Sequence, residues 1–132
     1  SDGVDGLRFA GWGLAFKPRT DDMREAPSLD IIRWLLKGGA SVVAFDPVAT
    51  ERASEELQGA ISYVANDLDA LDGADALVIC TEWPEFRRPD FSEMRSRMAG
   101  NVIFDGRNIY SLEMMREHRF SYYSVGRRPQ LA

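Results

Sequence analysis

Residues 7–16 read LRFAGWGLAF, a run in which Arg8 is the only charged side chain. Residues 41–47 read SVVAFDP, a second apolar run that is rich in β-branched residues and ends at Pro47. Strands that are almost continuously apolar, instead of alternating apolar and polar, are typical of a parallel sheet that is covered on both faces. The two runs therefore predict neighbouring strands of such a sheet.

The segment between these two runs predicts a helix. Residues 28–39 read SLDIIRWLLKGG, and apolar side chains recur there at helical spacing. Pro27-Ser28 is a start signal, and Gly38-Gly39 is a stop signal. A charged connection, GLAFKPRTDDMREAPS over residues 13–28, joins the first strand to this helix.

The same alternation of strand and helix continues along the chain. Further strands are expected at residues 61–65, 76–83, 101–105 and 120–126, and further helices at 49–58, 67–74, 91–98 and 111–118. The fold class is therefore α/β, a Rossmann-like doubly wound parallel sheet of about six strands between two helical layers. With 132 residues and no linker in sequence, the prediction is one domain over residues 1–132.

Composition excludes several classes of function. The 16 basic residues are spread out against 21 acidic ones, for a net charge of -5, so a nucleic-acid partner is not expected. No apolar run approaches the roughly 20 residues that span a bilayer, and no signal segment opens the chain, so neither a membrane partner nor export is expected. The single cysteine fits a reducing compartment, and the predicted location is the cytoplasm. The start SDGVDG, without Met, suggests either a processed chain or a piece of a longer protein.

A dinucleotide site is the first candidate, because Gly11 and Gly13 end the first strand and Asp46 ends the second. The fingerprint then fails: its third glycine would fall at Phe16, and the helix begins about ten residues too late. A tight turn and a capping aspartate are the preferred interpretation. A phosphoacceptor domain is set aside too, because no lysine follows a late strand.

A metal site and a Cys/His pair are not expected, because the chain has only His118 and Cys80 for such roles. Both are interpreted as structural. A further group of large side chains at helical spacings is expected in the core: Trp34, Met94, Met98, Met114 and Met115.

Three cations remain at the edge where strands of a parallel sheet end and where ligands bind: Lys17, Arg24 and Arg107. Arginine and lysine suit phosphate and ribose recognition, so these residues could bind an anion. They could equally make local ion pairs with nearby acids, namely Asp21, Asp22, Glu25 and Asp105. From position and charge alone, both interpretations stay open.

Four strings resemble one family: GLAFKPRTDDMREAPS, TEWPEF, VIFDGRNIY and the late YYSVGR. Together they are similar to the C-terminal, UDP-binding domain of the UDP-glucose/GDP-mannose dehydrogenase family, over residues 7–127. The combination of TDDMREAPS with TEW and DGRN resembles the UDP-glucose branch. Ser111 stands where the family commonly has Asp-Pro, a difference expected to alter only a helix start.

The resemblance implies an enzymatic activity to which this chain would contribute only as one part of a longer enzyme. Members of the family oxidise UDP-glucose to UDP-glucuronate in two NAD-dependent steps through a cysteine thioester. An N-terminal NAD-binding domain and a central helix precede the UDP-binding domain, and the enzyme is expected to be a homo-oligomer. Cys80 does not match the catalytic cysteine, so the chain is expected to contain no catalytic residue and to be inactive alone. Two alternatives are another UDP-hexose dehydrogenase and a free-standing nucleotide-binding or regulatory module.

The resemblance also implies roles for particular residues. Phe16 and Lys17 match positions that line the UDP-sugar site, and Arg107 matches an arginine that reaches the ribose and phosphates. Arg24 matches an arginine directed at NAD, a cofactor held mainly by the N-terminal domain. The acids of the first loop, Asp21, Asp22 and Glu25, are expected to orient these cations, whereas Arg127 and Arg128 are expected to form a solvated end.

Overall fold

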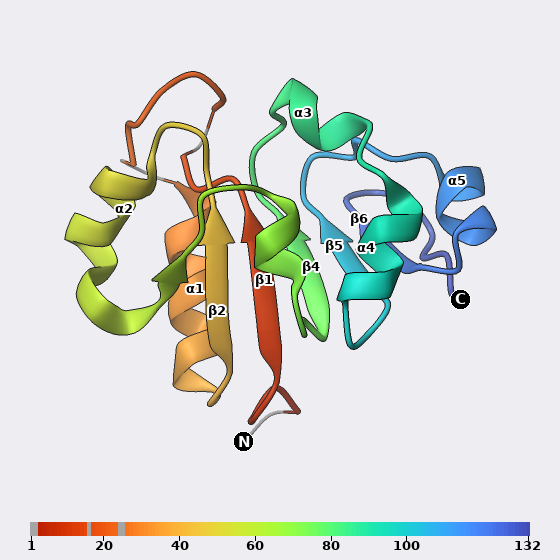
Figure 1. The fold of residues 1–132 in the computed structure, drawn as a ribbon, viewed down its shortest axis with the longest axis horizontal. Coiled ribbons are helices and arrows are strands. Elements are labelled where there is room, and N and C mark those ends of the chain that lie inside the picture. The colour runs from red at the N-terminus through yellow and green to blue at the C-terminus, as the bar shows by residue number, and fades with distance from the viewer. Residues whose placement is uncertain (1–2, 16, 24–25) are drawn as a thin grey trace.

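A six-stranded parallel sheet with helices on both faces is the architecture of the chain (Figure 1). The computed structural model describes residues 3–15, 17–23 and 26–132. The strands are β1 (Arg8–Trp12), β2 (Ser41–Phe45), β3 (Ser62–Tyr63), β4 (Ala76–Ile79), β5 (Val102–Asp105) and β6 (Ser121–Ser124). The helices are α1 (Pro27–Lys37), α2 (Thr50–Leu57), α3 (Pro84–Arg87), α4 (Phe91–Arg97) and α5 (Leu112–Glu117), with short 3-10 turns η1 (Gln58–Ala60) and η2 (Leu68–Leu71).

The strand order is β3-β2-β1-β4-β5-β6, and each neighbouring pair is parallel. The chain thus builds outward from β1 in one direction, returns, and builds outward from β1 in the other. This order confirms the doubly wound fold and the expected reversal beside the first strand. Ligands of such sheets bind at the carboxyl edge near this reversal.

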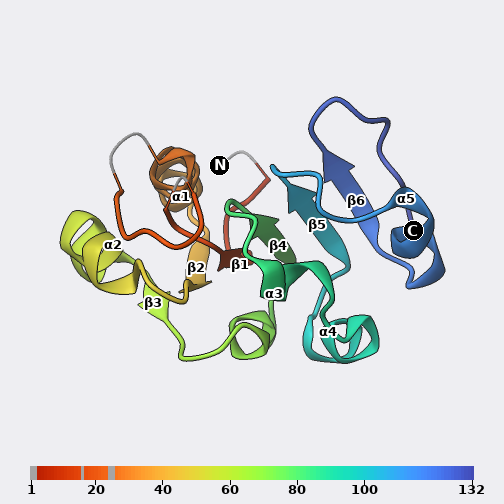
Figure 2. The ribbon, with the colours of Figure 1, turned by 90° about the horizontal axis from the view of Figure 1, so that it is seen from above.

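Each face of the sheet has its own hydrophobic core. On one face, α1 and α2 pack on β1 and β2 through side chains such as Leu29, Ile32 and Val42. On the other face, η2, α3, α4 and α5 pack on the sheet around Trp12 and Ile103. Figure 2 shows α1 on one side of the strands and α3 and α4 on the other.

Helix α1 follows the predicted pattern, with Pro27 in its first turn and Gly38 capping its end. Its buried stripe contains Ile32 and Leu35, but Trp34 is 57% exposed. The expectation that Trp34 belongs to the core is therefore wrong, because it lies beside the stripe that faces the sheet. Met114 is exposed as well, whereas the other three methionines expected in the core are buried: Met94, Met98 and Met115.

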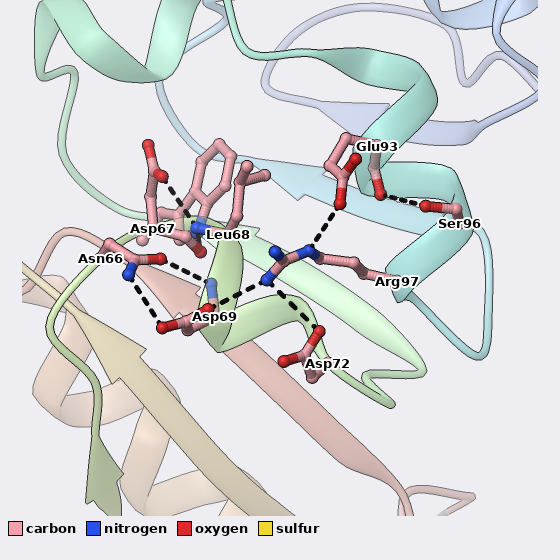
Figure 3. Close-up of polar contacts among 9 residues, drawn as sticks. Asn66, Asp67, Leu68, Asp69, Asp72, Glu93, Ser96 and Arg97 are labelled. Carbon is pink, nitrogen blue, oxygen red and sulfur yellow. Dashed lines mark hydrogen bonds and ion pairs between the residues drawn. The ribbon is translucent and has the colours of Figure 1, made fainter.

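The segment between β3 and β4 departs from the prediction of a helix over residues 67–74. Only the turn η2 forms, and the Asp67 carboxylate accepts a hydrogen bond from the backbone N–H of Leu68. Figure 3 shows Arg97 of α4 between acidic side chains, with ion pairs to Glu93 at 2.9 Å and to Asp69 at 3.0 Å. The segment is thus held by contacts with α4 that helical periodicity does not reveal.

The connection after β4 also differs from the prediction, which extended the strand through Trp83. The strand ends at Ile79, and α3 begins at Pro84.

Within the described residues, no helix has the length and apolar character needed to cross a membrane.

Candidate functional site

A cavity of about 310 Å³ opens at the carboxyl edge of the sheet, between the ends of β4, β5 and β6 and the first turns of α1. Its walls contain Cys80, Arg107 and Ser124, each close to the end of one of these strands. The Ser124 hydroxyl is buried and has no hydrogen-bond partner among the described residues. The cavity therefore combines apolar walls with the cation of Arg107.

Arg107 is positioned by the aspartate that ends β5. The Asp105 carboxylate, only 1% exposed, accepts hydrogen bonds from the backbone N–H groups of Arg107 at 2.8 Å and Ile109 at 2.7 Å. Asp105 thus fixes the backbone of the loop. The Arg107 guanidinium instead lies near Glu82, with Nη2 3.6 Å from Oε1. At this distance the pair is a loose one, which an anionic ligand can compete with.

A buried polar network supports the same loop from β6. The Tyr122 hydroxyl donates a hydrogen bond to Asp105, and burial is the main cause that raises the pKa of Tyr122. Arg127 donates to the Tyr122 hydroxyl at 3.0 Å and to the Tyr110 carbonyl at 2.9 Å. Its guanidinium also lies 5.5 Å from the centre of the Tyr122 ring. The expectation of a solvated Arg127 is therefore wrong, whereas Arg128 is exposed as expected.

Lys17 lies on the loop that follows β1 and is exposed. Because β1 and β5 point the same way in one sheet, Lys17 and Arg107 follow strand ends at the same edge. This confirms the expected shared edge for these two residues, although Lys17 is not among the residues that line the cavity. The other two predicted site residues, Phe16 and Arg24, lie outside the described residues.

The first loop is tied to α2 by Asp21, which pairs with Arg52 at 3.5 Å. Both side chains are more than half exposed, so this ion pair contributes little stability. The expected function of Asp21, orienting the loop cations, therefore receives no support from its observed partner. The backbone N–H of Asp22 donates to the Thr20 hydroxyl, a local turn contact. Glu25 lies outside the described residues.

The residues that resembled a dinucleotide fingerprint have structural tasks. Gly13 has φ +88°, and a Cβ there would lie 2.4 Å from the Thr81 side chain, so the glycine permits close packing with Thr81. The Asp46 carboxylate accepts hydrogen bonds from the backbone N–H groups of Leu14, Val48 and Ala49. The turn-and-cap interpretation is confirmed, and these described residues do not fit a complete NAD site.

Cys80 lies in the cavity wall, but its chemistry is that of a structural thiol. Burial raises the pKa of the Cys80 thiol to about 12, and the charge of Arg107 lowers it only in part. The thiol therefore stays protonated near neutral pH and is a poor nucleophile. His118 packs against the Phe91 ring at 4.9 Å. Among the described residues, no cluster of His, Cys, Asp or Glu is arranged to hold a metal ion.

The sequence matches a known domain over most of its length. The model of the UDP-glucose/GDP-mannose dehydrogenase family, UDP binding domain, matches residues 10–112. The chain belongs to this dehydrogenase family. The resemblance inferred from four motifs is thereby confirmed, and the chain corresponds to the family's C-terminal, UDP-binding domain.

Relatives with known names support membership of the dehydrogenase family. The UDP-glucose 6-dehydrogenase of Pseudomonas aeruginosa is 45% identical over an alignment of 127 positions, and the alignment covers 92% of this chain and 28% of that relative. UDP-glucose 6-dehydrogenase TuaD of Bacillus subtilis is 41% identical over 124 residues, covering 94% of this chain and 27% of that protein. The chain thus spans a little over a quarter of the length of these relatives.

Solved structures of dehydrogenases show the same fold. A UDP-glucose dehydrogenase from the archaeon Pyrobaculum islandicum superimposes with a TM-score of 0.76 at 34% identity, over 97% of this chain and 26% of that one. NDP-N-acetyl-D-galactosaminuronic acid dehydrogenase from Methanosarcina mazei gives a TM-score of 0.81 at 28% identity, and the match covers 95% of this chain and 26% of that one.

Three features of the dehydrogenase domain's edge were missed by sequence reasoning: the pairing of Glu82 with Arg107, the free Ser124 hydroxyl, and the buried network of Asp105. Glu82 had one signal, because it falls in the TEW string directly after β4. The buried network of Asp105 gave no such signal in the sequence, because it joins residues from β5, β6 and the connection between them.

Proposed function

We propose that this chain is the UDP-sugar-binding domain of an NAD-dependent UDP-glucose 6-dehydrogenase that oxidises UDP-glucose to UDP-glucuronate. The observation that carries the proposal is a cation, Arg107, in the wall of a cavity at the carboxyl edge, in a chain of this family. The names of relatives at 41–45% identity favour UDP-glucose over another UDP-hexose. The domain spans residues 1–132 and is one part of a longer enzyme.

Arg107 and Lys17 are the proposed contacts for the anionic part of the substrate. The pyrophosphate carries two negative charges, and an arginine and a lysine at one sheet edge complement them. Arg107 supplies a fork of donors for phosphate and ribose oxygens, at the expense of its loose pair with Glu82. Phe16 completes the UDP-sugar wall beside Lys17, a role that rests on the family resemblance.

NAD and the catalytic cysteine belong, in this proposal, to the remainder of the enzyme. The described residues offer neither a dinucleotide cradle nor a reactive thiol, as Gly13, Asp46 and Cys80 illustrate. Arg24 is the one residue of this chain assigned to NAD, across the cleft between domains. We place the enzyme in the cytoplasm as a homo-oligomer, with the N-terminal and central domains as the partners of this one.

Replacing Arg107 with alanine in the full-length enzyme should weaken UDP binding. Loss of a charge-assisted contact costs about 1.5–3 kcal/mol, which corresponds to roughly a ten- to hundredfold higher Kd. Isothermal titration calorimetry with UDP measures the change. The matched control is Arg128→Ala, because Arg128 is an exposed arginine away from the cavity lining. Equal Kd values for the two variants would show that Arg107 does not bind the nucleotide.

The isolated chain should produce no NADH from UDP-glucose and NAD, because it would lack the nicotinamide site and the nucleophile. Absorbance at the NADH band, followed with full-length enzyme as positive control, measures this.

The rival proposal is a free-standing nucleotide-binding or regulatory module. It shares the expectation of no NADH production, but it does not require this chain to be part of a longer enzyme. It is distinguished by the parent reading frame, which should extend upstream into a glycine-rich dinucleotide motif if the dehydrogenase proposal is right.

A further inference from the structure

The Tyr122 side chain links the end of the chain to the loop that carries Arg107. It extends from β6, is fully buried, and donates a hydrogen bond through its hydroxyl to Asp105. A hydroxyl has one proton and can accept two further hydrogen bonds. Arg127 donates one of these at 3.0 Å, and the backbone N–H of Tyr110 approaches as the second donor at 3.4 Å. The hydroxyl is therefore held between a guanidinium and a carboxylate.

The Asp105 carboxylate connects Tyr122 to the backbone of the loop. Its Oδ2 atom accepts from the Tyr122 hydroxyl and also from the backbone N–H of Ile109 at 2.7 Å. Its Oδ1 atom accepts from the backbone N–H of Arg107 at 2.8 Å. A carboxylate that is 1% exposed depends on such donors, because little solvent reaches its charge. A change at the Tyr122 hydroxyl therefore reaches the backbone of Arg107.

The segment that follows β6 also contacts this loop directly. The side-chain amide of Asn108 donates to the Val125 carbonyl at 2.9 Å, and Arg127 donates to the Tyr110 carbonyl at 2.9 Å. Asn108 directly follows Arg107 and has a left-handed φ of +57°. Each of these two bonds joins residues that are 17 positions apart. The loop is thus held on one side by Asp105 and on the other by the end of the chain.

Arg127 is itself fixed by its surroundings. Its side chain is partly buried, and its guanidinium lies 5.5 Å from the centre of the Tyr122 ring, within the range of a cation–π contact. The chain then returns along β6: Gln130 forms an antiparallel bridge with Tyr122, and its backbone N–H donates to the Tyr122 carbonyl at 2.9 Å. This return closes the segment that contains Arg127, so the guanidinium can act as a fixed support.

We propose that Arg127 is a positioning residue for nucleotide binding, which holds the loop of Arg107 in place by way of Tyr122. The inference rests on the proposed function, in which Arg107 binds the anionic part of the substrate. Arg127 is not among the residues that line the cavity, so its effect on the ligand passes through Arg107. The alternative is that Arg127 contributes only to the stability of the folded domain.

Hydrogen exchange in the full-length enzyme without nucleotide tests whether Arg127 holds the loop. Arg127→Met removes the guanidinium but keeps a long unbranched side chain. The backbone N–H groups of Arg107 and Ile109 should then exchange about fivefold faster or more, because the loop opens more easily. Val48 is the matched control, since its backbone N–H makes the same kind of bond to Asp46 at another strand end and should keep its rate. Unchanged exchange at Arg107 and Ile109 would overturn the proposal.

Titration of four full-length proteins with UDP tests the effect on the ligand: the parent, Arg127→Met, Arg107→Ala and the double variant. Arg127→Met should raise the Kd roughly three- to tenfold, as expected for residues coupled in one hydrogen-bond network. In the Arg107→Ala background the same change should raise the Kd less than about twofold, because the cation that Arg127 positions is gone. Arg128→Met, at an exposed neighbouring position, is the control and should leave the Kd unchanged.

The four Kd values distinguish failure of this proposal from failure of the proposed function. An equal increase with and without Arg107 would make Arg127 purely structural and overturn the proposal. A parent-like Kd for Arg127→Met, beside a weakened Arg107→Ala, would overturn it and leave the proposed function intact. A parent-like Kd for Arg107→Ala would contradict the proposed function and the nucleotide role of Arg127 together. The exchange rates, measured without nucleotide, would still decide whether Arg127 holds the loop.

A second variant covers the case in which Arg127→Met does not fold. Arg127→Lys keeps the positive charge and can donate to one of the two acceptors, the Tyr122 hydroxyl or the Tyr110 carbonyl. It should change the exchange rates and the Kd in the same direction by smaller factors. Parent-like values for both measurements in Arg127→Lys, with Arg127→Met unfolded, would overturn the proposal.

Discussion

Replacing Asp105 with alanine is expected to lower the free energy of unfolding by about 3–5 kcal/mol, because several buried hydrogen-bond donors would lose their acceptor at once. The carboxylate accepts from two backbone N–H groups and from the Tyr122 hydroxyl, in a position that is 1% exposed. Domains of this kind are stable by about 5–15 kcal/mol in total, so the loss is a large share. Urea denaturation followed by circular dichroism measures it.

A pair of neighbouring tyrosines provides the control for Asp105. Tyr122→Phe removes only the hydroxyl that bonds Asp105 and should cost about 1–2 kcal/mol. Tyr123→Phe removes a hydroxyl from the opposite, partly exposed face and should change the unfolding free energy by less than about 0.5 kcal/mol. If Asp105→Ala were no more destabilising than Tyr123→Phe, the buried network would have no structural importance.

Gly13→Ala is expected to destabilise the domain by about 3 kcal/mol or more, since left-handed strain and steric overlap add. The added Cβ would lie 2.4 Å from the Thr81 side chain and 2.7 Å from its backbone nitrogen. Thr81 is fully buried and donates to the Ala15 carbonyl, so it has little room to move. Thermal unfolding of the variant checks the effect.

Gly126→Ala separates the two causes. Gly126 also has a positive φ, +72°, but its added Cβ would meet nothing within 4 Å. This variant should therefore cost only the backbone strain, about 1–2 kcal/mol. Equal losses at Gly13 and Gly126 would mean that the contact with Thr81 does not restrict position 13.

The order of strands and helices was predictable from local pattern, because it depends on the period of apolar residues and on turn signals. Residues 27–39 illustrate this: proline and glycine mark both ends of α1, and the apolar spacing is helical. Exposure was less predictable. Trp34 has the right spacing for a core residue, yet it lies beside the stripe of α1 that faces the sheet, and the spacing of apolar residues alone does not show which of them are covered.

The candidate site was predictable in its location but only partly in its contacts. Lys17 and Arg107 follow strands, and parallel topology brings strand ends to one edge whatever the intervening length. Their partners depend on distances between segments remote in sequence. Arg107 approaches Glu82, 25 positions earlier, and Arg127 contacts Tyr110, so the interpretation of Arg127 as a free end was wrong. The ligand-binding roles proposed for Phe16, Lys17, Arg24 and Arg107 all stay predictions.

Asp46 and Asp105 play the same structural role at two strand ends: each is a buried carboxylate that accepts hydrogen bonds from backbone N–H groups of the loop after its strand. A loop held in this way has already lost its conformational entropy during folding, at about 1–2 kcal/mol per residue. A ligand that meets such a loop does not have to order it again. The edge that carries Arg107 is therefore preorganised, and nucleotide binding there should proceed with little entropic penalty from the protein backbone.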